Sequence, residues 1–217
     1  MALPTYLELV NDVLVRLREP EVTTVNENNL SRVVGKFIND GKRQVEDSYR
    51  WNALKNTLTV STSNGTYNYS VTGIGQRFKV IDVYNVTDKK HLENASADYM
   101  TDLIEGSGNA GAPYFYNFNG VDTNGDTKVD LAPIPNGVFS IKFNVYLPQD
   151  NLRLDADTLK IPAEPVTAWA LARALVERGE DGGLQSSEAY ALFKQVLADY
   201  IDIERGRYVE EEGWRTV

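Results

Sequence analysis

The chain has 217 residues, with 42% hydrophobic residues, 24% charged residues and no cysteine. This composition is typical of a globular protein, and the lack of cysteine excludes disulfides and thiolate metal sites. The formal charge of −9 argues against a sequence reader of DNA, since such proteins normally present a basic face. An acidic chain either avoids DNA or lets it pass without binding. The sequence has neither a long apolar run nor a basic and apolar leader, so we expect no membrane contact and no secretory signal.

Two helices are predicted before residue 55. The stretch from Thr5 to Glu8 matches a capping box, and the apolar spacing that follows predicts a helix ending near Arg18, before Pro20. A second helix is expected over about Asn29–Tyr49. Gly41 lies on the apolar stripe of this second helix, where the missing side chain would let another helix approach closely.

The period then changes to that of strands. Leu58 and Val60 alternate with polar residues, and Asn64-Gly65 predicts a hairpin turn to a partner strand over 66–71. Ser96 is expected to cap a short helix over 96–105. Further strands are predicted over 78–86, 114–119, 128–131 and 139–147. Strands joined by turns indicate an antiparallel sheet or a small sandwich.

The last third returns to helix. One helix is expected over Val166–Arg178, a break over Gly179–Gly183, and a final helix capped by Ser187 or Ser186. Two amphipathic hairpins would bury their apolar stripes by packing together. The fold class predicted is therefore α+β, a four-helix bundle with an inserted antiparallel β-sheet or sandwich domain. The expected boundaries are 1–54 and 158–206 for the bundle, 55–157 for the β domain and 207–217 for a C-terminal docking tail.

The sequence lacks the usual catalytic motifs. His91 is the only histidine, and it lies in a polar turn where a triad is not expected. Neither a nucleophile elbow, a phosphate loop, a dinucleotide fingerprint nor a zinc-protease motif occurs. We therefore expect no enzyme activity and no cofactor. A hydrolase that uses carboxylates alone is a remote alternative, and it requires a cleft with two carboxylates at the spacing found in glycosidases.

One segment admits a metal interpretation. In Asp122–Asp130 the oxygen-bearing side chains of Asp122, Asn124 and Asp126 alternate as at the start of a calcium loop. The glycine comes at the fourth position instead of the sixth, and the twelfth position is Pro133 instead of a glutamate. We therefore favour a plain hairpin turning at Asn124-Gly125. The calcium interpretation supports an alternative function, a calcium-dependent β-rich binding or adhesion module.

Aromatic residues mark two further candidate surfaces. Tyr114, Phe115, Tyr116 and Phe118 fill both faces of one strand, which favours burial in the chain's own core over contact with another chain. Trp214 stands in an otherwise polar end segment. Tryptophan is a common interface anchor, so the end segment docks on a partner, folds back on its own helices or stays loose.

Two blocks of sequence resemble the head-to-tail adaptor of podoviruses, the tail tubular protein A family. The first runs from Leu9 to Val22 through Arg18-Glu19-Pro20, and a helix ending in Ser48-Tyr49-Arg50-Trp51-Asn52 follows it. The second comprises 131–137, Asp155-Ala156-Asp157, Ile161-Pro162 and 172–181.

The resemblance implies a virion protein of the phage neck that is made in the host cytoplasm. Such adaptors form a ring, commonly of twelve subunits, between the portal protein and a nozzle similar to tail tubular protein B. Tail fibres are a further expected partner, and double-stranded DNA passes through the ring during genome ejection. The C-terminal tail of such adaptors reaches into the portal. In this chain the expected portal-docking residues are Arg205, Arg207, Tyr208, Trp214 and Arg215.

Overall fold

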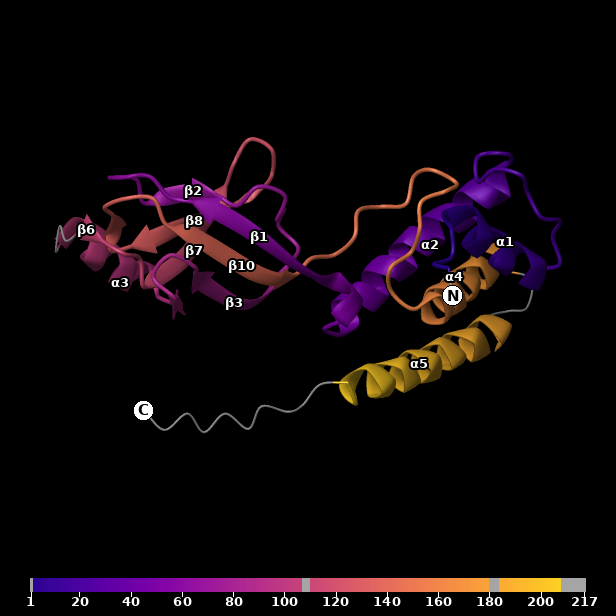
Figure 1. The fold of residues 1–217 in the computed structure, drawn as a ribbon. Helices are drawn as coiled ribbons and strands as arrows, with labels where there is room; N and C mark the ends of the chain where they lie inside the picture. The colour runs from indigo at the N-terminus through magenta and orange to yellow at the C-terminus, as the bar shows by residue number, and fades with distance from the viewer. Residues whose placement is uncertain (1, 107–109, 180–183, 208–217) are drawn as a thin grey trace. The chain divides into compact units, whose positions relative to one another are not determined.

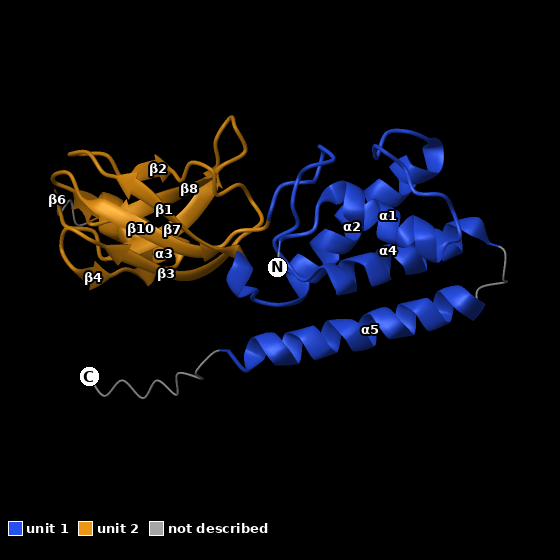
Figure 2. Ribbon diagram, turned by 45° about the vertical axis from the view of Figure 1, so that its right-hand side comes forward, with its two compact units in different colours: residues 1–53, 149–217 blue, residues 54–148 orange. Residues whose placement is uncertain are grey.

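The computed structural model describes residues 2–106, 110–179 and 184–207, and it has a mixed α+β fold (Figure 1). The chain divides into two compact units, coloured separately in Figure 2. The helical unit comprises Met1–Ala53 and Gln149–Val217, and the β unit comprises Leu54–Pro148. The predicted fold class is confirmed at this level, and each unit is described by itself below.

The return of the chain to the helical unit comes earlier than the sequence suggested. Residues 149–157 were expected in the β domain, but they belong to the helical unit. Leu152 is buried there, and the side-chain amide of Asn39 pairs with both its backbone N–H (2.8 Å) and its carbonyl (3.0 Å). A carboxylate oxygen of Asp155 accepts a hydrogen bond from the backbone of Val25 at 3.0 Å. Residues 149–157 belong to the helical unit because they form hydrogen bonds with it and pair with no strand of the sheets.

Helix α1 (Tyr6–Arg16) begins where the capping box predicts. Thr5 and Glu8 exchange the two side-chain to backbone hydrogen bonds of that motif. The first two amides of the helix, those of Tyr6 and Leu7, donate to backbone carbonyls of Asp157 (2.8 Å) and Asp155 (3.2 Å). Free amides at a helix start need such partners. The 155–157 loop is thus the support on which α1 begins.

Helices α2 (Asn29–Ser48) and α4 (Ala163–Arg178) cross closely. A Cβ added at Gly41 of α2 would meet the Val166 carbonyl oxygen at 3.0 Å and Trp169 Cε3 at 3.2 Å. The prediction that Gly41 permits a close helix approach is therefore confirmed. Helix α4 is buried on most sides through small residues: Ala168, Ala170, Ala172 and Ala174.

Helix α5 (Leu184–Arg205) packs along α4, as both views show (Figures 1 and 2). Helices α1, α2 and α4 pack on one another. The described part of α5 begins at Leu184, so Ser186 and Ser187 lie within the helix and do not cap it. Ser186 is buried, as is Phe193 from the expected apolar stripe.

The β unit contains two four-stranded sheets. The first has the order β1-β10-β3-β4, with strands Lys55–Ser61, Ser140–Tyr146, Lys79–Asn85 and Lys90–His91. The second has the order β2-β8-β7-β5, with strands Asn68–Ser70, Thr127–Ala132, Phe115–Val121 and Glu93–Asn94. The smaller elements are η1 (Asn52–Leu54), α3 (Ala97–Thr101), η2 (Asp102–Gly106), β6 (Ala110–Gly111) and β9 (Ile134–Pro135).

The core of the β unit draws side chains from both sheets. Val83 and Phe143 from the first sheet cluster with Tyr116, Val129 and Leu131 from the second. The rings of Tyr116 and Phe143 meet edge to face with centroids 6.4 Å apart. Of the aromatic strand, Tyr116 is the ring that is buried, and Phe118 packs partly against the same cluster. Burial in the chain's own core therefore holds for the face with Tyr116 and Phe118, whereas Tyr114 is exposed.

The predicted hairpin between residues 58 and 71 is wrong. A turn does occur, and Gly65 has a positive φ of 77°, but the strands on either side enter different sheets. β1 pairs with β10, and β2 pairs with β8. The Thr62 hydroxyl bonds to the Gly137 carbonyl and the Phe139 amide, which holds the chain beside β10 before it crosses over. β1 therefore pairs with β10, which is distant in the sequence, and not with the strand that follows the turn.

The β unit begins and ends at neighbouring points of one ladder. Lys55, the first residue of β1, pairs with Tyr146, the last residue of β10. Beyond it the Leu147 amide donates to the Leu54 carbonyl at 2.8 Å. The two crossings to the helical unit therefore start side by side.

Candidate assembly interface

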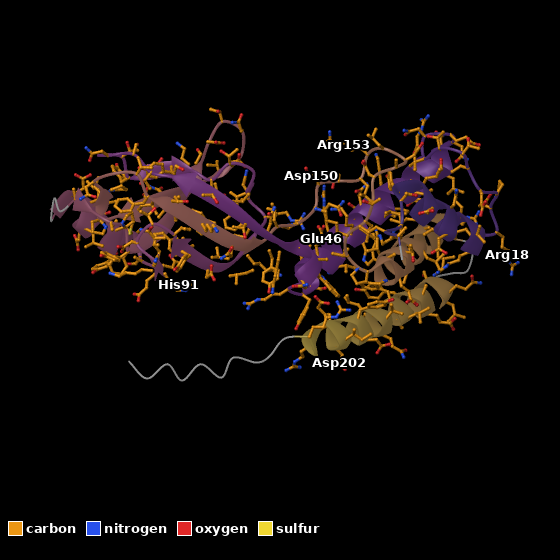
Figure 3. The ribbon with its side chains drawn as sticks, viewed as in Figure 1. Arg18, Glu46, His91, Asp150, Arg153 and Asp202 are labelled. Atoms are coloured by element: carbon orange, nitrogen blue, oxygen red, sulfur yellow. The ribbon has the colours of Figure 1, made fainter. Side chains whose placement is uncertain are left out.

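The histidine expected to be non-catalytic lies on an exposed strand. His91 is in β4, and its ring meets the Tyr84 ring edge to face at 4.9 Å between centroids (Figure 3). Within the described residues no group of three or more histidine, cysteine or acidic side chains is placed to hold a metal ion. The arrangement around His91 is thus an aromatic contact at a sheet edge.

The two aspartates of the candidate calcium loop, Asp122 and Asp126, accept hydrogen bonds from backbone amides. Asp122 accepts hydrogen bonds from the amides of Asn124 (2.8 Å) and Asp126 (2.9 Å), and the second of these is the largest cause of its lowered pKa. Asp126 accepts from the amides of Gly73 (2.9 Å) and Gly75 (3.0 Å). Carboxylates engaged in this way close a turn and pin it to the neighbouring loop. The geometry lends no support to a calcium module.

The hairpin that was favoured instead is confirmed. Strands β7 and β8 are antiparallel, with Tyr116 opposite Leu131 and Val121 opposite Thr127. Gly125 has a φ of 86°, the left-handed region that glycine adopts without strain. The segment is therefore a turn whose sequence happens to alternate oxygen side chains.

The expected portal-docking residues are only partly within the described chain. Arg205 and Arg207 lie exposed at the C-terminal end of α5. Tyr208, Trp214 and Arg215 lie outside the described residues. The helix end from which this segment starts is firmly held: Glu204 is 4% exposed, its Oε1 accepts from the Asn52 amide at 2.6 Å, and its Oε2 accepts from Arg207 at 2.9 Å.

Sequence reasoning missed Glu204, although a signal existed. The residue lies 11 positions after the buried Phe193, which returns it to the same side of the helix. A carboxylate on a buried side of a helix requires partners. The Asn52 amide and Arg207 supply them, so Glu204 fixes the place where the C-terminal segment leaves the helical unit.

The two sequence blocks that carry the resemblance meet in the helical unit. Glu19 of the Arg-Glu-Pro loop forms an ion pair with Arg178 at the end of α4, and Arg178 also donates to the Leu17 carbonyl at 2.9 Å. Trp51 of the first block is 1% exposed, and its indole N–H donates to the Val45 carbonyl at 2.6 Å. These motifs therefore hold the helices together.

A buried ion pair holds the point of return from the β unit. Lys42 and Glu46 lie one turn apart on α2, their charged atoms are 3.1 Å apart, and both side chains are 0% exposed. Lys42 donates to the Gln149 carbonyl at 2.5 Å, and Glu46 accepts from the Gln149 amide at 3.0 Å. The pair was not foreseen, although Lys42 follows Ile38 by four positions on the apolar stripe of α2.

The outer side of α5 is partly apolar. Leu184, Leu192 and Ile203 are 69%, 53% and 56% exposed. The residues between them on that side include Glu188 and Asp199, and Figure 3 labels Asp202 near the C-terminal end of the helix. No described helix is long and apolar enough to cross a membrane. The three exposed apolar side chains make this side of α5 a candidate for contact with protein.

The fold and these surfaces define an α+β protein in which a sheet unit is inserted into a helical unit, with its candidate contact residues on helix surfaces. Comparison with known families makes this specific. Residues 4–213 match the SU10 adaptor protein family, so the chain belongs to that family of phage adaptor proteins. Membership implies interaction with other head and tail proteins of a phage. None of the curated proteins matches the chain.

Proposed function

We propose that this chain is a structural head-to-tail adaptor of the tail tubular protein A type. Twelve copies assemble into a ring in the virion. The ring joins the portal to the tail nozzle and lines the channel for DNA ejection. Tail fibres are a further partner, and the chain has no catalytic role. The observation that carries the proposal is the family match over residues 4–213, which includes both the helical and the β unit.

The physical properties of the chain are compatible with this role. A closed ring requires two different contact surfaces on each subunit. We propose that α1, α2, α4 and α5 act together as a four-helix scaffold that presents these surfaces. The net charge of −9 disfavours strong phosphate contacts, which would hold back DNA moving through a channel.

The proposed portal contact lies in the segment after α5. Trp214 and Arg215 are its expected anchors, with Arg205, Arg207 and Tyr208 at its base. The contacts of Glu204 support this, because they hold the base of the segment at Asn52. Deleting residues 208–217 should leave the subunit folded and abolish binding to the portal, and Trp214→Ala should weaken that binding.

Co-sedimentation with the portal protein tests the docking segment. Circular dichroism of the truncated chain provides the control for folding. Unchanged co-sedimentation of the truncation would show that the segment is not the portal contact, and the adaptor role would then have to rest on another surface.

Electron microscopy of phage particles tests the whole proposal. We expect a ring of this chain between portal and nozzle, with density that fits both units. Finding the chain elsewhere in the particle, or absent from it, would refute the adaptor role.

A further inference from the structure

The outer side of α5 carries a regular row of side chains. We define the α5 outer stripe as Leu184, Glu188, Leu192, Gln195, Asp199 and Ile203. These residues follow one another at steps of three and four, which places them on one side of a helix. All six are exposed, while Phe193 and Glu204 on the opposite side are buried. The α5 outer stripe is therefore a continuous surface that carries three apolar and two acidic side chains, with Gln195 between them.

This pattern differs from scattered surface hydrophobics. Single exposed apolar residues are normal on a protein surface. Here three large ones, each more than half exposed, recur along one side of a helix that already packs on α4 with its other side. Apolar groups on one side, spaced by acids, fit a partner that offers long basic side chains. Such side chains cover apolar surface with their stems while their charges reach the acids.

The same chain offers a surface of that kind. We define the α2 basic stripe as Arg32, Lys36 and Arg43, which lie at steps of four and seven on the exposed side of α2. Arg32 donates to the Asn26 carbonyl at 3.0 Å, and Arg43 donates to the side-chain oxygen of Asn151 at 3.2 Å. These acceptors are neutral and remove no charge, and the exposed Asp40 and Asp47 on the same side of α2 leave that side with a small net positive charge. Asp40 lies beside the stripe near its middle.

We propose that the α5 outer stripe of one subunit packs on the α2 basic stripe of a second copy of this chain. Glu188 and Asp199 then face the basic side chains, and the leucines and Ile203 lie against their aliphatic stems. The proposal rests on the proposed ring and identifies the two surfaces that build it. Pairing of two α5 stripes with each other is disfavoured, because Glu188 and Asp199 would then oppose like charges.

The geometry of this contact suits a ring. Two different surfaces on one subunit make a head-to-tail contact, which repeats from copy to copy and closes if the rotation allows. A symmetric dimer would instead use one surface twice. The proposal thus predicts oligomers larger than two, held by one kind of contact.

The lack of cysteine makes a direct test possible. Gln195→Cys lies at the middle of the α5 outer stripe and Asp40→Cys beside the middle of the α2 basic stripe, so they approach in either helix direction. Neither Gln195 nor Asp40 is one of the side chains that attract the partner surface in the proposed contact. The two single-cysteine chains, carrying different tags, are mixed at about 1 mM, where contacts as weak as a millimolar Kd are populated, and are then oxidised. We expect a mixed disulfide product on a non-reducing gel.

A matched control uses another exposed helix position. Val15→Cys on α1, where Val15 is 53% exposed, should give little mixed product with Asp40→Cys. A chain with both Gln195→Cys and Asp40→Cys should form a ladder of covalent oligomers. Absence of the mixed product, or equal yield from the control, would overturn the proposed contact.

Charge reversal separates this inference from the adaptor role. Glu188→Lys with Asp199→Lys should lower self-association roughly a hundredfold in sedimentation velocity, since juxtaposed like charges cost several kcal/mol. Arg32→Glu with Lys36→Glu should do the same, and mixing the two reversed chains should restore association. Rings in phage particles that are unaffected by either reversal would overturn the α5 to α2 contact while leaving the adaptor role intact.

Discussion

The buried ion pair of α2 allows a quantitative prediction. Lys42→Met removes the cation next to Glu46 in a site where both side chains are 0% exposed, and it also removes the donor to the Gln149 carbonyl. Breaking a buried pair from one side costs about 3–5 kcal/mol, because the remaining charge stays buried. With a urea slope near 2 kcal/mol/M, the unfolding midpoint of the helical unit should fall by roughly 2 M.

Two companion variants give this prediction its controls. Lys42→Met with Glu46→Met removes both charges and leaves only the backbone groups of Gln149 without partners, so it should cost about 1–3 kcal/mol. Arg16→Met breaks the Asp12–Arg16 pair, which has the same spacing and the same 3.1 Å separation but side chains 41% and 44% exposed. That loss should be below about 1 kcal/mol.

Tryptophan fluorescence is the assay because of where the tryptophans are. Trp51 and Trp169 lie in the helical unit, Trp214 lies outside the described residues, and residues 54–148 contain no tryptophan, so the signal contains no contribution from a tryptophan of the β unit. A midpoint for Lys42→Met close to that of Arg16→Met, or a double variant as unstable as the single one, would refute the reasoning.

Three further outcomes are expected. Gly41→Leu should destabilise the helical unit by about 1–3 kcal/mol in urea, because its Cβ would already meet the Val166 carbonyl at 3.0 Å; an unchanged midpoint would contradict the close crossing. Asp157 has a lowered pKa, mainly because the Arg153 amide donates to it, so the ionised group stabilises the fold above about pH 4 and this contribution is lost as the pH falls through the folded pKa. Asp157→Asn should therefore weaken the acid dependence of the urea midpoint, and an identical pH profile would count against this. The melting temperature should not respond to calcium or to a chelator, since Asp126 is engaged by backbone amides; a calcium-dependent rise would bring back the binding-module interpretation.

Local signals predicted the helices well. The capping box at Thr5 and Glu8 lies within four residues and closes as expected, and the role of Gly41 followed from its place on one apolar stripe. The hairpin at Asn124-Gly125 was also predicted correctly, because the two strands next to the turn, β7 and β8, pair with each other. Each of these features depends on neighbours in the sequence.

Features set by distant partners were less predictable. The turn at Asn64-Gly65 has hairpin chemistry, yet β1 pairs with β10, about 80 residues later, and no local signal distinguishes the two partners. Lys42 and Glu46 have the spacing of an ordinary surface pair, and although Lys42 follows Ile38 on the apolar stripe, no local signal predicts that the loop at Gln149 covers them. Three of the expected portal-docking residues lie outside the described part of the chain, namely Tyr208, Trp214 and Arg215, so their role stays a prediction.

The adjacency of Leu54 and Leu147 has an evolutionary consequence. Because the sheet unit starts and finishes at one hydrogen-bonded pair, its ends are already close enough to be grafted between Ala53 and Gln149 of another such chain. The sheet unit can thus be exchanged as a cassette without a change in the helices that hold the helical unit together.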